Sequence, residues 1–570
     1  MSNQTLNHSD GVAGLKKVDM KTRTVVFMIY CLVAAGAFGI EEMVSESGPG
    51  ITLIMLIIFP IIWAWPISNL VAEAGSLLPS EGGVYVWARD AFGEFWGFQA
   101  GWWNTVSIYI TNGIYAALVV GYTSQFIEMS NATQFMLKIA MILVFTIINL
   151  LGIREVGAVS TAFSIAILAA FALVAMVGFL NWQGNPFDPF IADWGGGDTL
   201  SPSEAIGGCL AICIWMYCGY ECISTLAGEV KNPQVIPKGL LVAMPLIALT
   251  YVLPTMGGLA SLPGSWADWS TDGTAGSMGY YAVLSQHLGT VWGYIFLFIA
   301  IISQCAIFNT YLASGSRGFF VLADDNLCPK FLVKVSKKRG VPYVGVLSLA
   351  LVTAILAQYD FTTLVMAEVV FVLALYVILP ASVIKLRKLA PIEDRLKNNL
   401  YVMPGGKYGI YFFAGIVMLI SVIALMINGT DYFLIGIIGC STGPLFYVIC
   451  KWAFGGISKR DPVNFPVNPK TKLAFGDTFY LGLYGVVAGF LSFVGSFFLR
   501  WWEGEWGEEY YFEEAESTFW IFDDYYAMLD MLRNIGIGLM VFGVIMFIVC
   551  KVADERRPVT KIIDSENLNM

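Results

Sequence analysis

Long apolar runs separated by short polar segments follow one another along most of the chain. Two of them, residues 139–153 and 156–182, contain no charged side chain and approach or exceed the roughly 20 residues that cross about 30 Å of hydrocarbon as a helix. Runs of this length predict membrane-spanning helices and exclude a barrel. We expect about fourteen spans, at 24–42, 51–78, 97–127, 135–151, 156–182, 204–228, 238–262, 290–323, 341–358, 361–386, 408–427, 431–453, 478–499 and 528–551.

The segments between these spans carry their charges asymmetrically. With the N-terminus inside, nearly all basic residues fall on one side, and the other side has little beyond Lys138, Arg500 and Arg533 near span ends. Cytoplasmic loops are enriched in Lys and Arg, so both termini are expected in the cytoplasm. The polar and basic first ~20 residues lack a convincing cleavage site, which predicts a cytoplasmic tail and not a signal peptide.

Composition supports a membrane protein and limits the kinds of site that the chain can hold. The chain is 57% hydrophobic and 13% charged with a mean hydropathy of +0.69. The core of a water-soluble protein could not bury that much apolar surface. Much of the net charge of −10 comes from one acidic stretch, 501–524, on the predicted outer side. The ten cysteines lie mostly inside apolar runs as packing residues, and there are only two histidines. We therefore expect no disulfide framework, metal site or cofactor, and no nucleic-acid partner.

Two spans combine glycine with a carboxylate at or near membrane depth. The first contains Ala34 to Glu42 and the sixth contains Trp215 to Cys222. Glycine weakens a helix by up to about 1 kcal/mol relative to alanine and allows an unwound turn. A Glu in hydrocarbon costs several kcal/mol unless it is solvated, paired or protonated. Glycine-interrupted helices at corresponding places of two five-helix sets indicate an inverted-repeat transporter with its site between the breaks.

Three motifs in order resemble the amino acid/polyamine/organocation (APC) superfamily. They are the broken first helix, GGVYVW at 82–87 and GEVKNP at 228–233, and the resemblance covers most of residues 20–455. It implies an all-α integral membrane protein with a five-plus-five inverted-repeat core, two added helices, alternating access and transport without ATP. The absence of a GxxxxGK[ST] motif agrees with that implication.

Within the superfamily, residues 36–42, 91–99 and 223–229 are most similar to polyamine uptake transporters of plants and protozoa. That similarity implies a carboxylate on helix one, Glu42 or Glu41, and another on helix six, Glu221. An amine of pKa near 10 stays cationic and needs a carboxylate when it leaves water. Helix six also resembles bacterial arginine/agmatine exchangers, which implies a gating tryptophan at Trp215. Asn309 stands where the plant family carries a further acid, which weakens the case for a long polyamine.

The candidate site residues follow from the two breaks and from polar side chains on helices three, eight and ten. Those for substrate binding are Gly36, Ala37, Phe38, Gly39, Ile40, Glu42, Ser107, Trp215, Tyr217, Cys218, Gly219, Tyr220, Glu221 and Asn309. Those for proton coupling or gating are Glu41, Glu221, Glu368 and Trp215. Small residues also serve close helix packing, and polar side chains often bond across helices, so each candidate has a structural alternative.

We predict a secondary transporter, an antiporter or proton symporter, of amino acids or cationic derivatives such as agmatine or putrescine. A neutral amino acid permease that uses its carboxylates for proton coupling is the alternative, and a substrate-sensing membrane protein is the non-transport one. No nucleophile, metal or cofactor set indicates an enzyme. The sequence leaves open the exact substrate, the coupling ion, the direction of transport and whether the chain forms a homodimer.

The predicted organisation has five parts in the plasma membrane. Residues 1–23 form a cytoplasmic tail, 24–390 the transport core of helices one to ten, and 391–455 helices eleven and twelve. Residues 456–551 add helices thirteen and fourteen with the acidic external loop 501–524, and 552–570 form a second cytoplasmic tail. The acidic loop could concentrate cations near the outer face or decorate the membrane interface.

Overall fold

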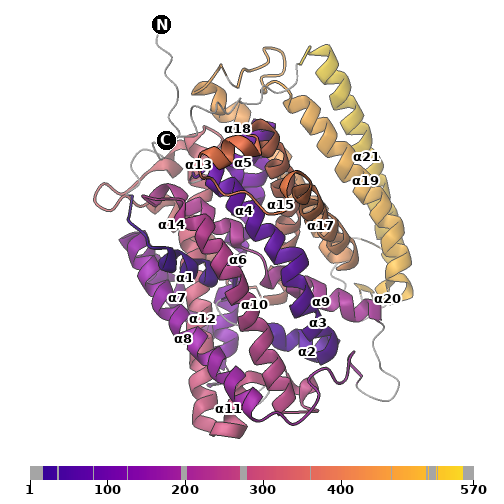
Figure 1. The fold of residues 1–570 in the computed structure, drawn as a ribbon. Helices are drawn as coiled ribbons and strands as arrows, with labels where there is room; N and C mark the ends of the chain where they lie inside the picture. The colour runs from indigo at the N-terminus through magenta and orange to yellow at the C-terminus, as the bar shows by residue number, and fades with distance from the viewer. Residues whose placement is uncertain are drawn as a thin grey trace.

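The computed structural model describes residues 17–34, 37–80, 82–124, 126–193, 202–269, 279–359, 361–463, 465–508, 511–512, 522 and 524–555. These residues form a bundle of helices (Figure 1). Extended backbone pairs within them only at two isolated bridges, Val18 with Val230 and Val467 with Ala474. The predicted all-α class is confirmed.

The first five predicted spans correspond to a continuous series of elements. Span one is broken into α1 and α2, and span two is interrupted by a π-helical turn at Pro60, which lacks the N–H needed to continue the ladder. The elements are α1 (Thr22–Val33), α2 (Ile40–Ser47), α3 (Pro49–Phe59), η1 (Pro60–Ala64), α4 (Trp65–Leu77), α5 (Val84–Phe92), α6 (Glu94–Ser124), α7 (Asn131–Leu151) and α8 (Ile153–Leu180).

The next five spans repeat this order, beginning again with a broken helix. The elements are α9 (Pro202–Met216), the 3-10 helix η2 (Tyr220–Glu229), α10 (Val235–Ser261), η3 (Trp266–Asp268), α11 (Gly279–Leu288), α12 (Thr290–Gly315), α13 (Gly318–Asp324), η4 (Lys330–Val333), α14 (Tyr343–Leu356) and α15 (Phe361–Leu389). The remaining elements are α16 (Ile392–Lys397), α17 (Gly406–Ile427), α18 (Thr430–Phe454), η5 (Ile457–Lys459), α19 (Asp477–Trp502), α20 (Gly504–Glu508) and α21 (Tyr525–Val552).

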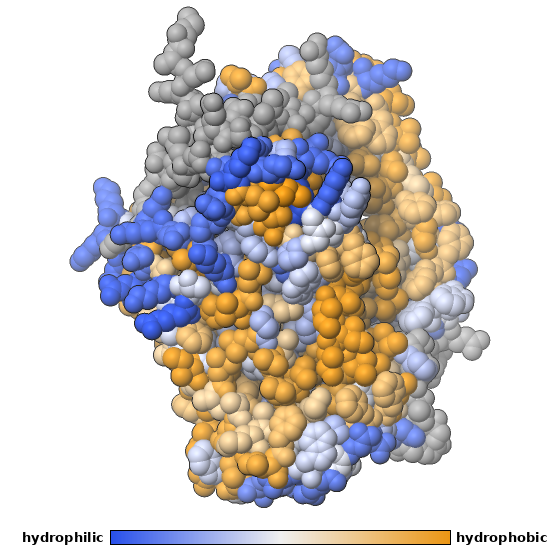
Figure 2. Space-filling view, in the orientation of Figure 1, coloured by the Kyte–Doolittle hydropathy of each residue, from blue (hydrophilic) through white to orange (hydrophobic). Residues whose placement is uncertain are grey.

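Length and composition of the helices agree with the predicted spans. In the part of the chain that the structure describes, twelve helices are long and apolar enough to cross a membrane. The two other predicted spans, the first and the ninth, contain the shorter apolar helices Thr22–Val33 and Tyr343–Leu356. Apolar side chains cover the middle of the visible face and the edge formed by α19 and α21, and polar ones gather at the top and bottom (Figure 2). The chain is therefore a multi-pass membrane protein.

The last two long helices, α19 and α21, lie side by side along the outer edge of the bundle (Figure 1). Glycines allow their backbones to approach closely: a Cβ on Gly489 would lie 2.5 Å from the carbonyl oxygen of Gly536. The acidic stretch 501–524 connects them, and residues 509–510, 513–521 and 523 of it lie outside the described residues. At its start, Glu503 accepts a 2.9 Å hydrogen bond from the Thr430 N–H at the beginning of α18.

Buried ion pairs join helices that are distant in sequence. Each of these carboxylates is nearly inaccessible and lies against a buried Arg or Lys, which compensates the loss of hydration. The pairs are Glu73 with Arg387 and Arg395, Glu94 with Lys451, Glu229 with Arg317, and Arg89 with Asp90 and Asp325.

Candidate functional site

Both predicted helix breaks are confirmed, and each ends at a glycine in the left-handed region. Gly39, with φ of 92°, precedes α2, and Gly219, with φ of 96°, precedes η2. A side chain at these dihedrals would be strained, so glycine suits both positions. Ala35 and Gly36 lie outside the described residues. The breaks interrupt the helical hydrogen bonds of spans one and six and leave backbone groups available inside the protein.

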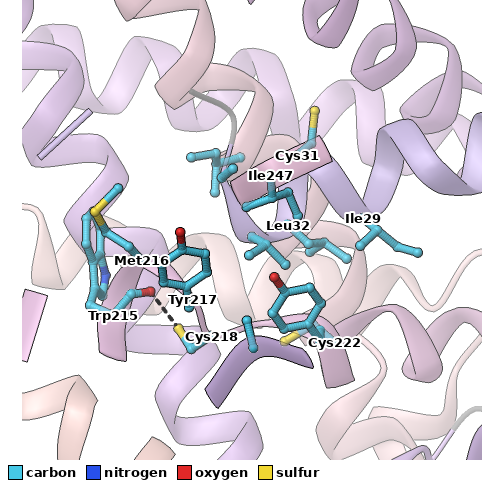
Figure 3. Close-up of a cluster of buried hydrophobic side chains, with 14 of the residues drawn as sticks. Ile29, Cys31, Leu32, Trp215, Met216, Tyr217, Cys218, Cys222 and Ile247 are labelled. Carbon is cyan, nitrogen blue, oxygen red and sulfur yellow. Dashed lines mark hydrogen bonds between the residues drawn. The ribbon is translucent and has the colours of Figure 1, made fainter. Parts of the chain in front are cut away.

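The two breaks lie against each other in the interior. A Cβ on Gly219 would come within 2.9 Å of the Leu32 carbonyl oxygen near the end of α1, and a Cβ on Gly39 within 3.2 Å of the Trp215 ring. Figure 3 shows Leu32 of α1 in one buried cluster with Met216 and Tyr217 at the break of helix six. The same view shows the Cys218 thiol donating to the Trp215 carbonyl, at 3.0 Å.

Tyr251 on α10 bridges the two interrupted helices. Its buried hydroxyl lies 3.3 Å from the Val33 carbonyl at the end of α1 and 2.9 Å from the Met216 carbonyl at the end of α9. These carbonyls have lost their intrahelical partners because the helices end there. Helix seven therefore places one hydroxyl between the two breaks, where it can donate to either carbonyl. The sequence did not single out this residue.

On the helix-one side, the buried carboxylate is Glu41. Its Oε2 accepts a 3.1 Å hydrogen bond from the Gly39 N–H, and its Oε1 is buried without a hydrogen-bond partner among the described residues. Glu42, which the sequence analysis placed in the binding set, is partly exposed. The carboxylate that reaches the break is therefore the one predicted for coupling or gating. Ala37, Phe38 and Ile40, which precede it in the chain, are also buried.

On the helix-six side, Glu221 follows Gly219 with the spacing by which Glu41 follows Gly39. The hydroxyl of Tyr376 on α15 donates a 2.7 Å hydrogen bond to Glu221 Oε2 and accepts one of 3.2 Å from the Gly219 N–H. The Cys222 thiol lies 3.6 Å from Glu221 Oε1. The neighbouring Tyr220 is buried, and its hydroxyl has no hydrogen-bond partner among the described residues.

A third buried carboxylate, Glu368, faces α6. Its Oε1 accepts hydrogen bonds from the Ser107 hydroxyl at 2.7 Å and the Thr111 hydroxyl at 3.1 Å. Its Oε2 is buried without a hydrogen-bond partner among the described residues. Because Glu368 and Tyr376 are eight positions apart, α15 presents both side chains about two turns apart.

A small cavity lies between the breaks, α6 and α12. It encloses about 10 Å³, roughly the room for one water molecule. A substrate the size of an amino acid needs more space, so the walls must separate to admit it. The lining residues are Val33, Ala34, Phe38, Tyr115, Trp215, Met216, Tyr251, Gln304 and Ile307.

Gln304 gives the cavity a polar group that the sequence analysis missed. Its side chain on α12 is 1% exposed, and its Oε1 has no hydrogen-bond partner among the described residues. A single amide in the apolar stretch 299–308 is the signal that could have identified it. A buried amide oxygen without a partner costs about 1–3 kcal/mol, and a bound donor would remove that penalty.

The polar groups of two predicted residues point away from the breaks. Asn309 on α12 points toward helix four, where its Oδ1 accepts a 3.1 Å hydrogen bond from Asn149. Tyr217 donates to the Leu56 carbonyl at 3.3 Å, so its hydroxyl faces helix two. Ser107, Trp215, Gly219, Glu221 and Glu368, by contrast, belong to the group around the breaks.

Comparison with known families decides the class of the protein. The amino acid permease family model matches residues 20–450, about three quarters of the chain and all of the elements that build this site. The chain belongs to the amino acid permease family.

This permease is similar to several proteins named as transporters. It is 30% identical over 360 residues to a probable polyamine transporter of Arabidopsis thaliana, a match that covers 62% of this chain and 68% of the relative. It is 29% identical over 374 residues to a polyamine transporter of Oryza sativa subsp. japonica, with 63% and 66% covered. An arginine/ornithine antiporter of Latilactobacillus sakei is 22% identical over 352 residues, with 60% and 72% covered.

The fold of the permease also has a solved counterpart. The crystal structure of MhsT in complex with L-phenylalanine superimposes with a TM-score of 0.52 and 12% sequence identity, covering 73% of this chain and 100% of that one. At this identity the likeness concerns the fold alone, and it agrees with the five-plus-five inverted repeat. The family and these relatives identify a transporter and not an enzyme.

Proposed function

We propose that this permease is a secondary transporter of small cationic amines or basic amino acids, with its site between the breaks of helices one and six. The observation that carries this proposal is the set of three buried carboxylates, Glu41, Glu221 and Glu368, at or beside the breaks. None of them has a basic partner among the described residues. Their arrangement contrasts with Glu73, Glu94 and Glu229, each of which contacts Arg or Lys.

The physical argument concerns charge compensation. A carboxylate removed from water costs several kcal/mol unless a cation or a proton neutralises it. A substrate ammonium supplies a positive charge and up to three donors. Glu41 Oε1 and Glu368 Oε2 are acceptors with no partner among the described residues, and the Gln304 oxygen is a third. Trp215 and Tyr115, whose ring centroids are 6.2 Å apart, line the same cavity as Gln304 and provide aromatic surface there for cation–π contact.

A neutral amino acid permease is the second candidate, and one observation favours it. Glu221 already lies within bonding distance of Tyr376 and Cys222, so it has less capacity to accept a substrate ammonium. In that case Glu221 and Glu368 would take up protons that accompany a neutral substrate. Proton symport and exchange of one substrate for another are the two coupling modes that fit these carboxylates.

The same proposal includes the placement of the protein in its membrane. Both termini lie in the cytoplasm of the cell, because the loops on their side hold most of the basic residues. Residues 24–390 serve as the transport core, 391–455 add helices eleven and twelve, and α19 and α21 are an accessory hairpin. A homodimer is the assembly we would test first, by crosslinking in native membranes.

Uptake by purified protein in proteoliposomes tests the proposal. Radiolabelled putrescine should be taken up and should be displaced by unlabelled agmatine, putrescine or arginine, and not by leucine. Glu41→Gln and Glu368→Gln should lower this uptake at least about tenfold, because loss of a buried charged partner typically costs 2–5 kcal/mol. Glu155→Gln, on an exposed carboxylate at the start of α8, is the matched control.

The competing interpretations give different results in the same assay. If only neutral amino acids displaced the label, the result would exclude a cationic substrate and support the proton-coupled neutral permease. Binding of a ligand without uptake or exchange would support a sensor.

A further inference from the structure

A groove lies at the C-terminal end of α7, and none of the residues of the helix breaks lines it. It has a volume of about 550 Å³. One wall is the last turn of α7, and the other is the loop between η4 and α14 together with the first residue of α14. The lining residues are Ile147, Leu150, Leu151, Val335, Ser336, Lys337, Arg339 and Tyr343.

The apolar part of the groove continues onto the outside of the bundle. Ile147 is 60% exposed and Leu151 38% exposed, and on α14 Leu351 is 64% exposed. These side chains belong to helices that cross the membrane, so their exposed surface faces acyl chains. One end of the groove therefore opens toward the lipid acyl chains.

The other end of the groove is basic. The Ser336 N–H donates to the Val341 carbonyl at 2.9 Å, and the Gly340 N–H donates to the Ser336 carbonyl at 2.8 Å. These bonds close a tight turn whose tip carries Lys337, Lys338 and Arg339, all exposed.

No acidic side chain compensates these cations within the part of the chain that the structure describes. None of the ion pairs found there includes Lys337 or Arg339. Glu155 on α8 lies beside Gly152 and does not line the groove. The basic end can therefore receive an external anion.

We propose that this groove binds an anionic phospholipid. Lys337 and Arg339 hold the headgroup phosphate, and one acyl chain follows the exposed side of Ile147 and Leu151. Basic pockets between membrane helices suit anionic headgroups, and the planar guanidinium of Arg can donate two hydrogen bonds to one phosphate. A soluble phosphate would use only the basic end, whereas a phospholipid uses both ends at once.

Native mass spectrometry of the purified permease in detergent tests the proposal with defined probes. We would titrate phosphatidylglycerol, phosphatidylcholine and glycerol 3-phosphate, which carries the phosphate without acyl chains. Phosphatidylglycerol should bind most tightly. Lys337→Gln with Arg339→Gln should weaken it by roughly 25-fold, because each basic residue near an anionic surface contributes about fivefold in affinity. Lys459→Gln with Lys472→Gln, on exposed lysines outside the groove, is the charge-matched control and should bind as the wild type does.

A second variant separates the lipid from a free anion. Ile147→Ser changes an exposed position of α7, so folding should be kept, as checked by the melting temperature. The substitution should weaken the binding of phosphatidylglycerol by several fold and leave the binding of glycerol 3-phosphate unchanged. Equal phosphatidylglycerol binding by the wild type and the Lys337/Arg339 variant would overturn the proposal in favour of nonspecific annular lipid. Displacement of the lipid by equimolar glycerol 3-phosphate would overturn it in favour of a soluble-anion site.

Discussion

The hydroxyl of Tyr376 donates a 2.7 Å hydrogen bond to Glu221 and accepts one from the Gly219 N–H. One side chain of helix ten thus bonds to both the backbone break and the carboxylate of helix six. Since α15 also carries Glu368, a movement of this helix would change the surroundings of two of the three carboxylates together. Helix ten, which carries the coupling or gating candidate Glu368, is therefore the helix whose movement we expect to gate the site.

Tyr376→Phe should impair transport without unfolding the protein. The ring and its packing remain, but Glu221 loses a donor, and a hydrogen bond to a charged group is worth about 1.5–3 kcal/mol, or roughly 10- to 150-fold. We expect a fall of that order in kcat/KM for uptake into proteoliposomes. Tyr109→Phe is the control, because that hydroxyl bonds to Ser348 between α6 and α14. An unchanged uptake rate in Tyr376→Phe would show that this bond does not serve transport.

Gln304→Leu should separate binding from stability. The buried amide oxygen has no partner among the described residues, so replacing it by an apolar side chain of similar size should keep or raise the melting temperature. If the amide binds substrate in the cavity, KM should rise at least about fivefold, since a lost hydrogen bond is worth about 1 kcal/mol or more. A lower melting temperature with unchanged KM would indicate a purely structural amide.

The sequence predicted the spans and the breaks well because both signals are local. An apolar run long enough to cross the membrane identifies a helix. Gly219, with Glu221 two positions later, indicates a break, because a buried carboxylate in a membrane helix is costly and is usually functional. Which side chains meet at the breaks could not be predicted in this way. Tyr376 and Tyr251 belong to otherwise ordinary spans, and only the packing of α15 and α10 brings their hydroxyls to the breaks.

The direction in which a side chain points was equally hard to predict. Glu41 and Glu42 are neighbours, and the rotation of α2 about its axis decides that Glu41 is buried and that Glu42 is partly exposed. Asn309 lies on helix eight, yet its amide group bonds to Asn149 of helix four. Adjacent helical positions differ by about 100° around the axis, so one residue is enough to change the neighbouring helix.

Glu73→Gln should destabilise the permease strongly. Glu73 is fully buried and bonds to Arg387 and Arg395, so the neutral variant leaves two buried guanidinium groups without their counter-charge. Breaking such a network costs about 3–5 kcal/mol. We expect a clear fall in the melting temperature in detergent. Asp394→Asn, which removes a partly exposed pair with Lys397 at 3.7 Å, should change stability by less than about 1 kcal/mol.

Gly489→Ala should loosen the hairpin of α19 and α21 and leave the transport site intact. The added methyl group would lie 2.5 Å from the Gly536 carbonyl oxygen and 2.7 Å from the Met540 nitrogen, so the helices must separate. Overpacking of this kind costs about 1–3 kcal/mol, which should lower the melting temperature. Gly538→Ala is the matched control on α21, because its Cβ would meet no atom within 4 Å. Since the family match ends at residue 450, substrate affinity should be the same in both variants. Loss of affinity in Gly489→Ala alone would instead show that the hairpin supports the site.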